Sequence, residues 1–138
     1  MLYSNNKNVT NNSFALKTPS NPQLEQLIEE SFECNKVFLN SRLTAQLLGA
    51  LLKVNSREIT AIVKNKYGIS FRDYINIFRL NYIKEEYLDK GLLKKYSLEY
   101  IIEKGGFGTR QSFYVSIKKH INCHPKDFLN SKTCLIQL

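Results

Sequence analysis

Two short stretches of the sequence place basic and polar side chains at helical spacing. Four residues of the first stretch stand at positions i, i+3, i+4 and i+7, which puts them on one face of a helix. These residues are Arg57, Thr60, Ala61 and Lys64. An arginine can donate two hydrogen bonds to one edge of guanine, a lysine can bind a phosphate, and a methyl group can contact thymine. This face therefore offers the chemistry of contact with nucleic-acid bases and phosphates.

The second stretch, residues 109–119, has the same character. Arg110 can bind guanine, Gln111 can bind adenine, and Tyr114 can bond a phosphate or stack on a sugar. Lys118 and Lys119 are expected to contact phosphates, which positions a protein on DNA without distinguishing bases. The alternative for each side chain is a solvated surface position, or partial packing in the case of Tyr114.

The sequence contains no arrangement that is typical of an enzyme or a metal site. It lacks the G-x-S-x-G, H-E-x-x-H and phosphate-loop glycine patterns. His120 and His124 are four residues apart, but no carboxylate or third ligand has an obvious place beside them. Cys34, Cys123 and Cys134 are odd in number and far apart, which favours three free thiols over a disulfide or a zinc site. We therefore expect no catalysis, no metal and no cofactor.

The apolar pattern predicts the helices that would position the two stretches. Capping residues mark helix starts at Asn55, Ser70 and Ser97, and Gly68 and Gly91 mark helix ends. The resulting helices are 23–39, 44–52, 56–67, 70–89, a short one after Ser97, 109–120 and a last turn at 125–128. The chain thus contains a short helix, a turn and a basic helix, twice. This is the helix-turn-helix arrangement, and it predicts an all-α fold of about seven helices, with two such units bridged by the long helix 70–89.

Two expectations concern the interior of this fold. Tyr74, Phe78 and Phe107 are expected to belong to the core. Arg79 lies in the bridging helix, and it is expected to pair with a glutamate or a carbonyl of the protein rather than with DNA.

The charge is divided unevenly along the 138 residues, whose net charge is +8. Residues 1–22 carry +2, residues 23–40 carry −3, and residues 41–138 carry +9. The basic excess favours a polyanionic partner. The predicted segments are a flexible polar tail or linker (1–22), an acidic amphipathic helix (23–39), the double helix-turn-helix domain (40–130) and a C-terminal tail (131–138).

Two absences in the sequence predict the location of the protein. No apolar run reaches the roughly 20 residues of a membrane helix. The N-terminus has no signal-peptide pattern. We therefore expect a cytoplasmic protein without a membrane partner.

Residues 39–129 resemble the DNA-binding domain of the AraC/XylS family of bacterial transcription regulators. The matching segments are GISFRDYIN (68–76), FRL (78–80), YSLEYI (96–101), Gly106-Phe107 and PKDF (125–128). The acidic segment before them, with Phe38-Leu39, resembles the one in regulators of the Bacteroidetes type.

This resemblance implies a fold, a partner and a set of contacts. The family has two recognition helices that enter successive major-groove segments of double-stranded DNA, and they correspond here to 56–66 and 109–119. The residues placed against bases are Arg57, Thr60, Ala61, Arg110, Gln111 and Tyr114, with Val115 beside them. The residues placed against the DNA backbone are Ser56, Lys64, Thr109, Lys118 and Lys119.

Other partners also follow from the resemblance. The acidic residues Glu85, Glu86 and Asp89 are expected to form a solvated face, which in this family can meet RNA polymerase. The 38 residues before the match are too few for a sensor domain, so a sensor would be a separate or missing piece.

Departures from the family pattern keep a second hypothesis open. Ile102 replaces a usual alanine, so the second unit is expected to repack or tilt. Ile117 replaces a usual phenylalanine, and Asn122 replaces a usual glycine, which is a mild change because asparagine tolerates the left-handed conformation. The leading hypothesis is a sequence-specific DNA-binding transcription regulator. The alternative is a protein-interaction module in which the second helix-turn-helix no longer contacts DNA and the acidic helix docks a partner chain.

Overall fold

The structure is a computed structural model that describes residues 21–131, 134 and 136. Residues 1–20 of the expected tail, and five positions between 132 and 138, lie outside the described residues. The elements are α1 (Pro22–Glu33), η1 (Val37–Leu39), α2 (Ala45–Leu52), α3 (Ser56–Tyr67), α4 (Phe71–Ile83), η2 (Lys84–Leu88), η3 (Leu92–Lys94), α5 (Leu98–Lys104), α6 (Arg110–His120) and α7 (Pro125–Leu129). The expected all-α fold with seven α-helices is confirmed for this part of the chain. No helix within it has the length and apolar character needed to cross a membrane.

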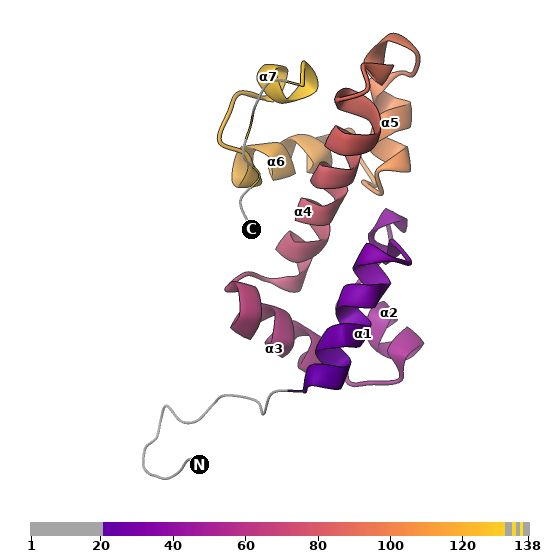
Figure 1. The fold of residues 1–138 in the computed structure, drawn as a ribbon, viewed down its shortest axis with the longest axis vertical. Helices are drawn as coiled ribbons and strands as arrows, with labels where there is room; N and C mark the ends of the chain where they lie inside the picture. The colour runs from indigo at the N-terminus through magenta and orange to yellow at the C-terminus, as the bar shows by residue number, and fades with distance from the viewer. Residues whose placement is uncertain (1–20, 132–133, 135, 137–138) are drawn as a thin grey trace.

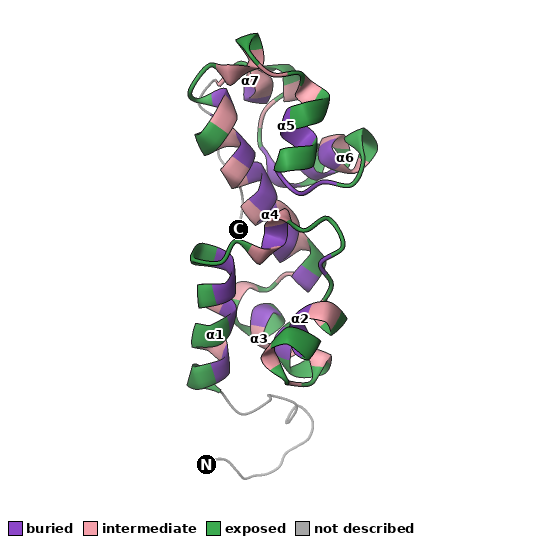
Figure 2. Ribbon diagram, turned by 90° about the vertical axis from the view of Figure 1, so that its right-hand side faces the viewer, coloured by how far each residue is buried: buried purple, intermediate pink, exposed green. Residues whose placement is uncertain are grey.

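The helix α4 runs along the middle of the molecule and joins two helical clusters (Figure 1). The helices α1, α2 and α3 surround its first half, and α5, α6 and α7 surround its second half. Buried residues follow α4 and the inner sides of its neighbours, as the purple segments of Figure 2 show. Accordingly, Tyr74 and Ile75 belong to the first core cluster, and Leu80 and Ile83 belong to the second. One helix thus serves as the interior wall of both helix-turn-helix units.

The helix starts expected from the sequence are present. The side chain of Asn55 accepts a hydrogen bond from the backbone N–H of Arg57 at 2.8 Å, and this begins α3. Ser70 and Ser97 cap α4 and α5 in the same way, each at 3.1 Å. Gly68 ends α3 with a φ of 75°. These local signals fix the residues at which the helices begin and end.

The acidic helix is shorter than the expected range 23–39. α1 ends at Glu33, and the chain then turns through Lys36, whose φ is 49°. Phe38 follows in the short turn η1, and its ring lies 6.0 Å from that of Phe32 and 5.5 Å from that of Phe78. The apolar spacing continued beyond the end of the helix, so it could not reveal that Phe38 enters the core from a turn. Lys84–Leu88 similarly form a π-helical end to the bridging helix, which the sequence predicted as uniform.

Arg79 locks the two units together from the middle of α4. Its Nε donates to the Phe38 carbonyl at 2.7 Å and its Nη2 to the Asn40 carbonyl at 2.9 Å. Its guanidinium also lies 5.6 Å from the centre of the Phe107 ring. Burial lowers the pKa of Arg79 to about 10. The expectation that Arg79 pairs with a carbonyl of the protein is confirmed, and its partners come from both units.

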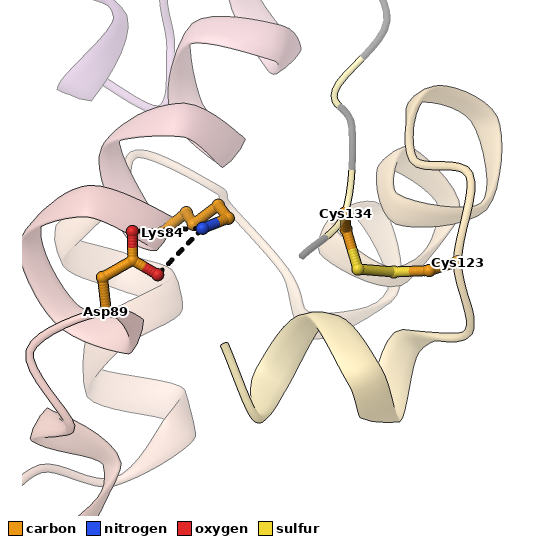
Figure 3. A network of polar contacts seen from close by, with 4 residues as sticks. All are labelled: Lys84, Asp89, Cys123 and Cys134. Carbon is orange, nitrogen blue, oxygen red and sulfur yellow. Dashed lines mark hydrogen bonds and ion pairs between the residues drawn. A yellow bond between two sulfur atoms is a disulfide. The ribbon is translucent and has the colours of Figure 1, made fainter. Parts of the chain in front are cut away.

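Cys123 and Cys134 form a disulfide with their Cα atoms 5.9 Å apart (Figure 3). The expectation of three free thiols is therefore wrong, and only Cys34 is free and exposed. The turn at α7 folds the chain back, so that Ile136 forms an antiparallel bridge with Ile121. This return brings together two cysteines that are separated by 11 positions, and an odd cysteine count carries no information about their pairing.

Figure 3 also shows the ion pair between Lys84 and Asp89, whose Nζ and Oδ1 atoms are 2.9 Å apart. This pair stabilises the end of the bridging helix.

Replacing Cys123 with serine is expected to lower the free energy of unfolding by about 2–3 kcal/mol, because the disulfide restricts the unfolded chain. Denaturant unfolding of the variant and of the disulfide-bonded wild type measures the difference in the free energy of unfolding. Cys34→Ser is the matched control and should leave the transition in place, since that thiol is exposed and free. An unfolding transition of the wild type that does not move when a reductant is added would contradict the disulfide between Cys123 and Cys134.

Candidate nucleic-acid interface

The first recognition helix, α3, is held by its apolar side and exposes its basic side. Ile59 and Val63 are buried in the first core cluster. The opposite face exposes Arg57, Thr60 and Lys64, as the spacing predicted. Thr60 donates to the Arg57 carbonyl at 3.0 Å, and Lys64 donates to the Gly68 carbonyl at 3.3 Å. Ala61 and Ser56 are half-buried. The Arg57 guanidinium has no ion-pair partner among the described residues, so it is available to a ligand.

The second recognition helix, α6, is arranged in the same way. Phe113 and Ile117 are fully buried, so the isoleucine that replaces the family's usual phenylalanine still fills the core. The exposed face carries Arg110, Gln111, Val115 and Lys118. Tyr114 is half-buried, with its ring 5.3 Å from that of Phe113. Partial packing of Tyr114, the alternative given by the sequence, is therefore present.

Arg110 differs from Arg57 because two neighbours already hold its guanidinium. It forms an ion pair with Glu99 of α5, and it lies 5.7 Å from the centre of the Tyr114 ring. Both partners of the ion pair are more than half exposed. Exposed ion pairs contribute about 0–1 kcal/mol, so binding of Arg110 to a base can replace this one at small cost. The sequence could not indicate this pair, because residues 99 and 110 meet only through the turn between α5 and α6.

A cluster around Asp73 fastens the end of α6 to the start of α4. The Lys119 Nζ lies 3.0 Å from Asp73 Oδ1, and the His120 Nε2 lies 3.3 Å from the same oxygen. Burial alone would raise the pKa of Asp73, but the hydrogen bond and charge of Lys119 and the nearby His120 lower it overall. Burial lowers the pKa of His120 from its ordinary value, although the nearby Asp73 acts in the opposite direction. Lys119 thus has a structural partner, whereas Lys118 has no ion pair among the described residues.

Ser56 and Thr109 mark the beginnings of the two recognition helices. Thr109 is the N-cap of α6 rather than its first residue, and its hydroxyl accepts the Ser112 N–H at 3.0 Å. Ser56 is the first residue of α3. Helix starts present free N–H groups and a positive dipole end, which suit a phosphate. Contact of these residues with the DNA backbone stays a prediction.

A hollow of about 520 Å³ lies between the two recognition helices. We call it the inter-helix hollow, because it touches Thr60 of α3 and Ser112 of α6. Arg42 and Arg72 also line it, and both are exposed. The sequence did not select these two arginines, since neither lies on a recognition helix. Their one signal was the basic excess of residues 41–138.

A helix-turn-helix domain family matches the chain over residues 48–131. The chain belongs to this AraC-type family. It is therefore a DNA-binding regulatory domain, and its family is not one of enzymes. No curated protein matches the chain. Among the described residues, no group of three or more His, Cys, Asp or Glu side chains is placed to hold a metal ion.

Solved structures extend the AraC-type likeness over most of the chain. The C-terminal domain of the two-component response regulator yesN from Fusobacterium nucleatum is 26% identical, with a TM-score of 0.54, over 70% of this chain and 94% of that one. A Listeria innocua protein of unknown function is 25% identical, with a TM-score of 0.64, over 82% of this chain and 100% of that one. The C-terminal domain of AraT, a response regulator from Geobacillus stearothermophilus, has a TM-score of 0.61 at 22% identity over 81% and 84% of the two chains. The last of these shows the fold alone.

Proposed function

We propose that this protein is a sequence-specific transcription regulator, with α3 and α6 placed in successive major-groove segments of double-stranded DNA. The observation that carries the proposal is the presentation of Arg57 and Arg110 by two capped helices that flank one hollow. Residues of α4 connect the two units, because Arg79 bonds the η1 turn and Asp73 pairs with Lys119 at the end of α6. Such preorganisation suits a ligand that must meet both helices at once.

The proposed contacts divide into base contacts and backbone contacts. Arg57 and Arg110 would bind guanine through paired hydrogen bonds, and Gln111 would bind adenine. Thr60 and Ala61 would contact methyl groups, while Tyr114 would stack on a sugar or bond a phosphate. Contacts to the DNA backbone would come from the remaining set, namely Ser56, Lys64, Thr109, Lys118 and Lys119.

The proposal also covers location and partners. Because its ligand is chromosomal DNA, we place the protein in the bacterial cytoplasm. Contact with RNA polymerase would use the acidic surface after α4, where Glu85 is exposed and Glu86 pairs with Lys90 at 3.1 Å. A sensor domain would belong to a separate chain or to sequence outside these 138 residues.

The test is duplex binding as a function of salt. The protein first selects duplexes from a random library, and its affinities for a selected duplex and a scrambled one are then measured. Release of counterions from three to five phosphates lowers affinity by roughly 40- to 500-fold between 0.05 and 0.2 M salt. We expect that steep dependence with both duplexes, together with a clear preference for the selected one. Absence of binding at low salt would reject the proposal and favour the protein-interaction module instead.

A further inference from the structure

The inter-helix hollow has an unusual charge. Its lining contains three arginines, Arg42, Arg72 and Arg79, and no aspartate or glutamate. A second hollow, of about 600 Å³, lies nearby beside α5, and its lining combines Glu99, Glu103 and Arg110. Only the first of these two surfaces is therefore uniformly positive, and only it touches both recognition helices.

Two of the three arginines are available to a ligand. Arg79 is buried and donates to carbonyls of the protein. Arg42 and Arg72 are exposed, and in the part of the chain that the structure describes neither forms an ion pair. Their backbones are nevertheless fixed in place. The Arg42 N–H donates to the Asn40 side chain at 2.9 Å, and Arg72 lies in the first turn of α4. Two unpaired guanidinium groups on a fixed frame favour an anionic ligand.

The position of the hollow indicates which anion it would meet. Two successive major-groove segments on one face of B-DNA are separated by a minor groove with a phosphate backbone on each side. A surface between two helices that occupy those segments must therefore face phosphates. The hydroxyls of Thr60 and Ser112 border this surface and are small enough to allow close approach.

We propose that the inter-helix hollow is a binding site for the DNA backbone between the two major-groove segments, with Arg42 and Arg72 each contacting a phosphate. This inference rests on the proposed function of α3 and α6, and it adds two contacts to that function. The site would hold the centre of the binding sequence without distinguishing its bases.

The first test compares Arg42→Ala, Arg72→Ala and the double variant with the wild type. Each arginine that leaves a phosphate lowers the slope of log affinity against log salt by about one unit. The affinities for the selected and the scrambled duplex should fall by the same factor, so that the preference between them is unchanged. Lys94→Ala is the matched control, because Lys94 is exposed on η3 and does not line the hollow. Salt slopes that equal the slope of the Lys94 variant would overturn the inference.

The second test locates the contact on the DNA. Neutral methylphosphonate linkages replace the phosphates that lie between the two major-groove segments of the selected duplex. We expect the wild type to bind this duplex more weakly than the unmodified one. The double variant should bind the two duplexes with the same affinity, because it lacks the arginines that contact these phosphates. Equal further losses for the two proteins would place the arginines elsewhere and overturn the inference.

A separate titration distinguishes the DNA backbone from a free anion. Inorganic phosphate is added to the protein without DNA. Binding that depends on Arg42 and Arg72, combined with indifference to the methylphosphonate linkages, would identify a small-anion site and overturn the inference. Failure of the wild type to bind any duplex would instead reject the proposed function itself.

Discussion

Replacing Gly106 with alanine is expected to lower the free energy of unfolding by about 2–6 kcal/mol, through backbone strain and overpacking together. The residue has a φ of 94°, a conformation that residues with a side chain rarely adopt. A Cβ at this position would lie 2.4 Å from the Phe38 carbonyl oxygen. That oxygen cannot retreat freely, because it accepts the Arg79 Nε hydrogen bond at 2.7 Å.

Two other glycines separate the causes of this effect. Gly91 has a φ of 68° and open space around it, so Gly91→Ala adds strain of about 1–2 kcal/mol without a clash. At Gly108 the nearest atom to an added Cβ is 4.0 Å away and φ is not positive, so Gly108→Ala adds neither. Denaturant unfolding of the three variants gives the comparison. A Gly106 variant no less stable than the Gly91 variant would show that the added Cβ meets no clash at the Phe38 carbonyl.

The contact between Gly106 and the Phe38 carbonyl is also expected to affect DNA binding. Gly106 lies in the turn between α5 and α6, and Phe38 belongs to the first unit through the η1 turn. Their contact, with Arg79 beside it, fixes how the second recognition helix is presented relative to the first. A Gly106 variant that still folds should therefore lose affinity for the selected duplex, since both helices can no longer meet their groove segments together.

Loss of both Arg57 and Arg110 is expected to abolish most of the preference for the selected duplex. One good bidentate contact with guanine contributes about 1–3 kcal/mol of discrimination. The two arginines lie on different helices and share no partner, so their effects should add, to roughly a 30-fold loss of preference or more. Arg110 should contribute the smaller share, because its ion pair with Glu99 is exchanged on binding.

The measurement is the ratio of affinities for the selected and scrambled duplexes, for the wild type and the double variant. Lys118→Ala is the matched control on α6, because Lys118 is exposed and is proposed to contact a phosphate. It should weaken binding to both duplexes by the same factor. Equal losses on both duplexes in the double arginine variant would refute base contact by these arginines.

The fold was largely predictable because its signals are local. Asn55, Ser70 and Ser97 cap the helices at which the sequence placed them, and Gly68 ends α3 as expected. These signals depend on side chains within a few residues of one another. The exposed faces of α3 and α6 followed from the helical periodicity of their apolar residues. The range predicted for α1 was too long, because this periodicity does not register the left-handed turn at Lys36.

The parts of the site that were missed depend on tertiary contacts. The disulfide between Cys123 and Cys134 forms because the chain folds back at α7. Arg110 meets Glu99, and Lys119 meets Asp73 across 46 positions, only once the helices pack. Arg42 and Arg72 became candidates when the structure placed them in the hollow between the recognition helices. Spacing along one helix contains none of this information.

The most direct test of two-helix recognition is the base pattern of the duplexes that the protein selects from a random library. Helices in successive major-groove segments predict two blocks of preferred bases about 10–10.5 base pairs apart. Selection with Arg110→Ala should then relax base preference within one block and leave the other intact, whereas Arg57→Ala should do the reverse. A single block in the wild-type selection, or a pattern that neither substitution alters, would contradict the account.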